Sequence, residues 1–170
     1  TVRALKMHGG GPSVVRGLPL KDEYTQENID LVRDGMCNLL KHIDNGRKFG
    51  VPVVVSINVH KDDTAAEHEL IKKAAMEHGA FACVTSNHWA EGGRGAVELA
   101  SALIDACNQE SNFKFLYELE LSIEEKISKI AKEMYGAGNV DFAAKVREAM
   151  RLYAEKGYSK LPICMAKTSA

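Results

Sequence analysis

The chain has 170 residues, of which 45% are hydrophobic and 26% are charged, and its formal net charge at pH 7 is -1. This is the composition of an ordinary globular protein, and it lacks the excess positive charge typical of a nucleic-acid-binding surface. No apolar run approaches the ~20 residues that span a bilayer, and no secretory signal is visible. We therefore expect neither a nucleic-acid partner nor a membrane partner.

The first segment predicts a short strand at residues 1–7, because polar and apolar residues alternate weakly there. Three glycines and a proline then predict a loop, and Lys6 and His8 are candidates to border a cleft beside it. Residues 26–48 follow as a long amphipathic helix, with apolar side chains at spacings of three and four and Thr25 as its cap.

A run of β-branched residues at 51–57 predicts a buried parallel strand that ends at Asn58. The polar loop after it contains His60 and Asp63, and it leads into Thr64-Ala65-Ala66-Glu67, a capping box that opens a helix to about residue 78. A polar loop at the end of such a strand is typical of ligand sites in α/β sheets. One interpretation is that Asn58 and Asp63 read a purine base.

A second strand is predicted at residues 80–85, followed by a polar, glycine-rich loop and a helix at 96–108. The single tryptophan, Trp89, lies in this loop, where its flat face is a candidate to stack on a ring ligand. Free amides at the start of the helix favour anions, and Arg94 adds further donors. The candidate contacts in this loop besides Trp89 are Glu91, Gly92, Gly93 and Arg94.

The last third of the chain predicts a strand at 113–117, a helix at about 123–135 opened by a second capping box, a helix at 142–156 and a strand at 161–166. The alternation of strands and helices before it predicts an α/β fold with a mostly parallel sheet and flanking helices. All the loops that follow strands are then expected at the carboxyl edge of one sheet.

The four cysteines lie far apart, and none belongs to a C-x-x-C pair, so zinc and thioredoxin-like chemistry are not expected. No spacing of histidines and carboxylates predicts a metal site either. Each cysteine has apolar neighbours, which predicts reduced cysteines in the core of an intracellular protein. They are Cys37, Cys83, Cys107 and Cys164.

Several segments together resemble one family, formate–tetrahydrofolate ligase, also called 10-formyltetrahydrofolate synthetase. They fall in the family's order and cover the whole chain. The matching segments are Thr1-Val2-Arg3-Ala4-Leu5-Lys6-Met7-His8-Gly9-Gly10, Glu27-Asn28, Asn38-Leu39, His42-Ile43, Phe49-Gly50-Val51-Pro52-Val53-Val54-Val55, Ile57-Asn58, Asp63-Thr64, Trp89-Ala90-Glu91-Gly92-Gly93, Lys126-Ile127, Ile130-Ala131, Tyr135-Gly136-Ala137 and Leu161-Pro162-Ile163-Cys164-Met165-Ala166-Lys167-Thr168.

The resemblance implies an enzyme that joins formate to tetrahydrofolate with MgATP, through formyl phosphate, to give 10-formyltetrahydrofolate. It implies formate, tetrahydrofolate and ATP as small-molecule partners, a monovalent cation as a further candidate, and a homo-oligomeric complete enzyme. The expected compartment is the cytoplasm, with the mitochondrion as the alternative. In the family two aromatic residues hold the pterin ring: one falls on Trp89, and the other, a phenylalanine, falls on His60 of this sequence.

The resemblance also implies an incomplete P-loop NTPase-like fold, in which residues 1–110 belong to the nucleotide- and folate-binding α/β domain and 111–170 to a helical continuation. The phosphate-binding loop is expected upstream and the C-terminal domain downstream, so we expect an internal fragment that has no ligase activity alone. The catalytic residues stay unassigned. The alternatives are a non-catalytic folate-binding or structural fragment, and an unrelated purine-nucleotide-binding α/β domain.

Overall fold

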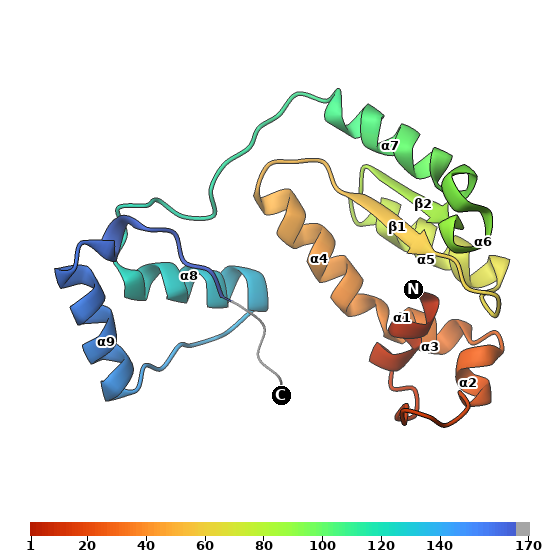
Figure 1. Ribbon diagram of the computed structural model, residues 1–170, viewed down its shortest axis with the longest axis horizontal. Coiled ribbons are helices and arrows are strands. Elements are labelled where there is room, and N and C mark those ends of the chain that lie inside the picture. Colours follow the sequence, from red (N-terminus) through yellow and green to blue (C-terminus); the bar gives the residue numbers. More distant parts are fainter. Residues whose placement is uncertain (166–170) are drawn as a thin grey trace. The chain divides into compact units, whose positions relative to one another are not determined.

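The computed structural model describes residues 1–165, and its chain divides into two compact units (Figure 1). The first unit comprises Thr1–Phe113 and the second begins at Lys114. The first is an α/β unit built around a parallel pair of strands, whereas helices provide the regular structure described in the second. The α/β class predicted from the sequence is therefore confirmed.

The first unit contains short helices before the sheet and longer ones beside it. Its elements are α1 (Val2–His8), α2 (Asp22–Thr25), α3 (Ile29–Asp34), α4 (Met36–Lys48), β1 (Val54–Asn58), α5 (Ala65–Glu77), β2 (Ala82–Ser86), α6 (His88–Glu91), the 3-10 helix η1 (Gly92–Ala96) and α7 (Val97–Cys107). Those of the second unit are α8 (Ile123–Tyr135), α9 (Ala144–Glu155) and the 3-10 helix η2 (Tyr158–Lys160).

The two strands run parallel, with Val54 opposite Ala82 and Asn58 opposite Ser86. Helix α5 connects them, as a parallel crossover requires, and its N-terminus has the predicted capping box. Helices α5 and α7 both pack against strand β2 (Figure 1). Because both strands end at the same edge, the loops that follow them start side by side.

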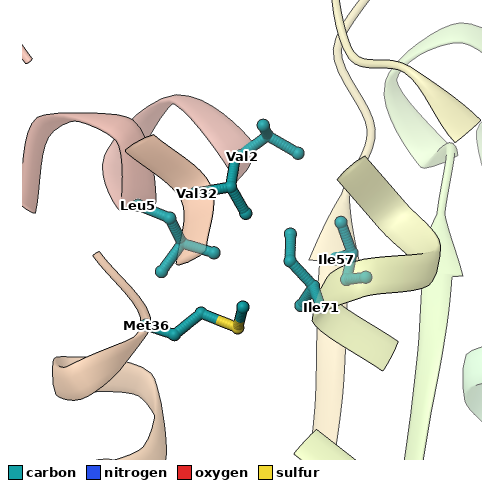
Figure 2. Packing of buried hydrophobic residues seen from close by; sticks show 6 residues of the cluster. All are labelled: Val2, Leu5, Val32, Met36, Ile57 and Ile71. Atoms are coloured by element: carbon teal, nitrogen blue, oxygen red, sulfur yellow. The ribbon is translucent and has the colours of Figure 1, made fainter. Parts of the chain in front are cut away.

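The main core of the first unit joins its N-terminal helices to the sheet. Figure 2 shows the six side chains of this cluster, which come from α1, α3, α4, β1 and α5. They are Val2, Leu5, Val32, Met36, Ile57 and Ile71. A second cluster, formed by Ile43, Ala75 and Ala80, extends the packing along α4 and α5.

The first segment is a helix, so the predicted strand at residues 1–7 is wrong. Thr1 caps α1 by accepting a hydrogen bond from the backbone amide of Ala4 at 3.2 Å. Val2 and Leu5, which are three residues apart, are both buried in the core. This spacing fits one face of a helix, and a segment of seven residues is too short for its weak alternation to distinguish a strand from a helix.

The predicted long helix at residues 26–48 is two helices, because the chain bends at Gly35. Asn28, and not Thr25, caps α3, since its side chain accepts from the amide of Leu31 at 3.0 Å. A Cβ atom at Gly35 would lie 1.8 Å from the carbonyl oxygen of Leu5, and one at Gly9 would lie 2.0 Å from that of Leu31. Glycine at these two positions lets α1 pack backbone to backbone against the bend.

In the second unit, the capping box predicted for α8 is present, with Ser122 and Glu125 bonded reciprocally. Residues 113–117 and 161–165 are not strands, and residue 166 of the second predicted strand lies outside the described residues. Instead, the Tyr117 hydroxyl accepts from the backbone amide of Ile163 at 2.8 Å. Lys126 is fully buried, and its ammonium donates to the carbonyl oxygens of Ser159 and Leu161.

The cysteines are free, as expected, but they do not share the predicted core location. Cys37, Cys107 and Cys164 are exposed, and only Cys83, on β2, is partly buried. The prediction was wrong because the neighbours of Cys37 and Cys107 in sequence lie on other faces of their helices, and Cys164 lies outside any helix or strand. Burial raises the pKa of the Cys83 thiol to about 11, against a smaller lowering effect of Lys72.

Candidate functional site

The candidate site lies at the carboxyl edge of the two strands. Asn58 and Ser86 are paired at this edge, and the backbone amide of Val59 donates to the carbonyl oxygen of Ser86 at 3.0 Å. The segment 59–64, here called the β1 loop, and the segment 87–95, here called the β2 loop, therefore begin at neighbouring positions. The fold thus brings the loops that carry His60 and Trp89 to one edge of the sheet, as predicted from parallel topology.

The β1 loop is closed by Asp63. The Asp63 carboxylate accepts from the backbone amide of His60 at 2.9 Å and lies 3.3 Å from Nε2 of His68. Its side chain is only 6% exposed, so Asp63 shapes the loop and does not face an incoming base. His60 and Asn58 are exposed, which leaves the imidazole of His60 accessible to a ligand.

The β2 loop turns back on itself before α7 starts. The backbone amide of Asn87 donates to the carbonyl oxygen of Gly95 at 2.9 Å, and the Asn87 side chain donates to Glu91 at 2.7 Å. Trp89 lies on the single turn α6 between these contacts, with 89% of its surface exposed. Trp89 is the most exposed of the large hydrophobic side chains in the described residues, so its ring face is accessible to a ligand.

Glycines make this tight loop possible. Gly92 adopts φ 59° and ψ -141°, a backbone conformation that is essentially restricted to glycine. A Cβ atom at Gly95 would lie 2.4 Å from the backbone of Asn87, so the closure of the loop also requires glycine there. A Cβ atom at Gly93 would meet no heavy atom within 4 Å. Gly95 was not among the predicted site residues, although it completes the same glycine-rich motif.

The charged residues of the β2 loop are both exposed. The Glu91 carboxylate accepts a hydrogen bond from the Asn87 side chain. Arg94 lies on η1, the 3-10 helix found where a free helix N-terminus was predicted. The α-helix α7 begins only at Val97. The amides predicted to attract an anion therefore lie in a 3-10 turn that continues into the helix.

Lys6 and His8 do not follow a strand, because α1 is a helix. His8 is the exposed last residue of α1. Lys6 is 1% exposed, and its ammonium lies 2.7 Å from the carboxylate of Glu67 and 2.7 Å from the carbonyl oxygen of Gln26, to which it donates. The structure therefore places Lys6 in the interior of the first unit, where it does not border an open cleft as predicted.

Glu67 is the polar residue that the sequence reading of the site missed. It is fully buried, and besides Lys6 it accepts from the backbone amides of Asn28 at 2.8 Å and Thr64 at 3.1 Å. Burial alone would raise the pKa of its carboxyl group, but the hydrogen bonds from these three groups and the charge of Lys6 lower that pKa below its ordinary value. The capping-box pattern indicated that Glu67 would bond the backbone of Thr64, but nothing in the sequence indicated that it would pair with Lys6.

Within residues 1–165, no group of three or more histidine, cysteine, aspartate or glutamate side chains is arranged to hold a metal ion. In the same part of the chain, no helix has both the length and the apolar character needed to cross a membrane.

The fold and the two loops define an α/β protein with a candidate ligand-binding edge and an exposed aromatic side chain. Comparison with known proteins is more specific: the family model of formate–tetrahydrofolate ligase matches residues 1–170, and the chain belongs to this family.

Relatives from animals and fungi agree with this assignment. The chain is 60% identical to a cytoplasmic C-1-tetrahydrofolate synthase of Spodoptera frugiperda and 56% identical to one of Drosophila melanogaster, each over 99% of this chain and 18% of the relative. It is 53% identical to a mitochondrial monofunctional C1-tetrahydrofolate synthase of Mus musculus, over 99% of this chain and 17% of the relative. The chain therefore spans less than a fifth of the length of these relatives.

Proposed function

We propose that the chain is the folate-binding part of an enzyme that ligates formate to tetrahydrofolate at the expense of ATP. The family match over residues 1–170 carries this proposal. The product is 10-formyltetrahydrofolate, formed when N10 of the folate takes the formyl group from formyl phosphate. In this reaction the protein contributes mainly by positioning the reactants and stabilising charge.

The pterin ring of tetrahydrofolate is proposed to bind between Trp89 and His60. The two residues are exposed, and they lie on loops that leave the same edge of the sheet. An indole face stacks well on a pterin, whereas an imidazole offers a smaller face than the phenylalanine of the family pattern. We infer that Trp89 provides most of the stacking energy and that His60 closes the other side.

The remaining assignments follow the family and depend on the complete enzyme. We propose that the parallel strands β1 and β2 belong to a larger P-loop NTPase-like sheet, to which other parts of the enzyme contribute the site for ATP and Mg²⁺. A monovalent cation and a homo-oligomeric state are proposed on the same basis. The names of several relatives favour the cytoplasm, with the mitochondrion as the alternative.

The second candidate function is a non-catalytic one for the isolated chain. It is supported by the small share, 18%, that the chain covers of its relatives. We expect the 170 residues alone to bind folate weakly and to form no 10-formyltetrahydrofolate from formate and ATP. A purine-reading function for Asn58 and Asp63 is not favoured, because the Asp63 carboxylate is held by the backbone of His60 and by His68.

The test is steady-state kinetics of the complete enzyme with Trp89→Ala. Loss of one aromatic stacking partner costs about 1–3 kcal/mol, so the KM for tetrahydrofolate should rise about 5- to 150-fold while the KM values for ATP and formate stay the same. Tyr135→Ala is the matched control, since Tyr135 is a 66% exposed aromatic residue at the end of α8.

His60→Phe tests the other side of the proposed pterin site. The larger phenyl ring should lower the KM for tetrahydrofolate several-fold. If Trp89→Ala leaves this KM unchanged, the pterin site is wrong as a whole; if only His60→Phe has no effect, the assignment of His60 is wrong.

A further inference from the structure

We propose that the buried Lys6–Glu67 pair is a positioning device that holds the β1 loop in its folate-binding conformation. This inference rests on the proposed function, because it assigns a binding role to that loop. Neither residue reaches the ligand. The pair acts through Thr64, the last residue of the loop, and so determines where His60 and the end of the loop lie.

The contacts of the Glu67 carboxylate join three segments at one point. Oε1 accepts from the ammonium of Lys6 at 2.7 Å and from the backbone amide of Asn28 at 2.8 Å. Oε2 accepts from the backbone amide of Thr64 at 3.1 Å. Lys6 also donates to the carbonyl oxygen of Gln26 at 2.7 Å. The end of the β1 loop is thereby fixed to α1 and to the turn before α3.

Thr64 receives further contacts that make it the fixed end of the loop. Its hydroxyl accepts from the amide of Glu67 at 3.3 Å and donates to the carboxylate of Glu27 at 2.7 Å. Next to it, Asp63 accepts from the amide of His60. The buried ion pair thus holds Thr64 by hydrogen bonds, and Asp63, the residue joined to Thr64 by a peptide bond, holds the amide of His60, the residue proposed to face the pterin.

The second capping box of the same protein shows that capping alone does not need such a pair. In α8, Glu125 accepts from Ser122 in the same reciprocal pattern, but it lies on the exposed surface. Glu67 instead is completely buried and bonded to a buried lysine and to a distant backbone amide. Burying two charges generally gains little stability, so their role here is better explained by the conformation they specify.

Replacing Glu67 by glutamine perturbs one contact in particular. The amide oxygen of glutamine can still accept from Lys6 and Asn28, but its NH₂ group then faces the backbone amide of Thr64. A donor faces a donor, so the Thr64 amide loses its acceptor and the end of the β1 loop is released. The rest of the first unit keeps its packing, because the side chain has nearly the same size.

The test compares Glu67→Gln with Glu125→Gln in the complete enzyme. Glu67→Gln should raise the KM for tetrahydrofolate at least fivefold, with the KM values for ATP and formate unchanged. Hydrogen exchange of the backbone amides of residues 60–64 should become faster in the same variant. Glu125→Gln, which alters the exposed capping box, should change neither the KM nor the exchange of this loop.

A double variant, Lys6→Met with Glu67→Met, keeps the test decisive if the single variant folds poorly. Replacing both charges by apolar side chains leaves no unpaired buried charge, so the protein should fold and still show the raised KM for tetrahydrofolate. A folded Glu67 variant with the wild-type KM would overturn the inference. Trp89→Ala separates the two proposals: if it raises the KM and the Glu67 variants do not, the pterin site stands and the positioning role fails.

Discussion

The contact of α1 with the bend at Gly35 gives a sharp prediction about stability. The backbone of Gly35 has φ -83° and ψ -3°, which alanine adopts without strain, so the cost of Gly35→Ala in the folded state comes from lack of space. The new Cβ would lie 1.8 Å from the carbonyl oxygen of Leu5 and 2.7 Å from the amide nitrogen of Gly9. That oxygen and that nitrogen are hydrogen-bonded to each other at 2.8 Å.

The expected destabilisation follows from these distances. Close carbon–oxygen contacts in proteins are about 3.3–3.6 Å, so α1 must move away by roughly 1.5 Å. Such overpacking costs about 1–3 kcal/mol, and weakening the hydrogen bond between Leu5 and Gly9 adds about 1 kcal/mol. Alanine also lowers the conformational entropy of the unfolded chain relative to glycine, which stabilises the folded state by up to about 1 kcal/mol. The net effect of Gly35→Ala is therefore a loss of about 1–4 kcal/mol in the free energy of unfolding.

Urea denaturation of the 170-residue chain, followed by circular dichroism, measures this loss. Gly138→Ala is the matched control, because a Cβ there meets no heavy atom within 4 Å, and it should change stability by less than about 0.5 kcal/mol. Gly9→Ala should behave like Gly35→Ala, since its Cβ would lie 2.0 Å from the carbonyl oxygen of Leu31. Equal stability of Gly35→Ala and Gly138→Ala would refute the close approach of α1 to the bend.

Two further predictions concern titratable groups. Because burial raises the pKa of Cys83 to about 11, only roughly one Cys83 thiol in a thousand is ionised at pH 8. Iodoacetamide should therefore modify the exposed Cys37 and Cys107 at least tenfold faster than Cys83, and peptide mass spectrometry measures these rates. Equal rates would contradict its burial. Glu67 has a lowered pKa in the folded state, so its stabilising contribution is present above its ordinary value of 4.5 and is lost as the pH falls through the lowered value. Urea midpoints from pH 6 to 3 should therefore fall more steeply for the wild type than for Glu67→Gln, and parallel profiles would show that Glu67 is not the group responsible.

The elements that the sequence predicted well are those specified by local chemistry. Thr64 and Ser122 each carry a hydroxyl that accepts from the amide three residues later, and a glutamate at that position returns the bond. All four contacts lie within one turn, so they form wherever the rest of the chain places the helix. The β-branched run before Asn58 likewise favours a strand, although the strand begins at Val54 and only Ile57 in it is buried.

The elements that were predicted wrongly depend on contacts between distant segments. Residues 2–8 form a helix whose buried face, with Val2 and Leu5, packs against α3, α4 and the sheet, and these distant contacts are not visible in the local sequence. The bend at Gly35 exists because α1 approaches it closely, and a single glycine within an amphipathic pattern did not indicate that neighbour. The first case also had local signals for a helix, in the Thr1 cap and in the helix-forming residues after it, whereas only tertiary packing determines the second.

The candidate site was predictable to the extent that topology determines it. Once β1 and β2 were taken as parallel neighbours, the loops carrying His60 and Trp89 had to leave the same edge. Their exposure, above all that of Trp89, was not predictable from sequence, since a lone tryptophan is as compatible with covering the sheet. The partner of Lys6 could not be predicted either, because Glu67 belongs to a helix beyond the first strand.

The site therefore depends on two kinds of polar residue that differ in where their bonds are made. Asn87 and Asp63 bond within their own loops, so they shape the β2 loop and the β1 loop locally. Glu67 bonds across the fold, to α1 and to the turn before α3, and only such a contact can fix the position of a loop relative to the core. A stacking site made of two separate loops needs this second kind of contact, because the gap between its two rings changes whenever either loop moves. For this reason substitutions at Glu67, which is buried and bonded to the end of the β1 loop, are expected to affect the proposed folate binding and not merely stability.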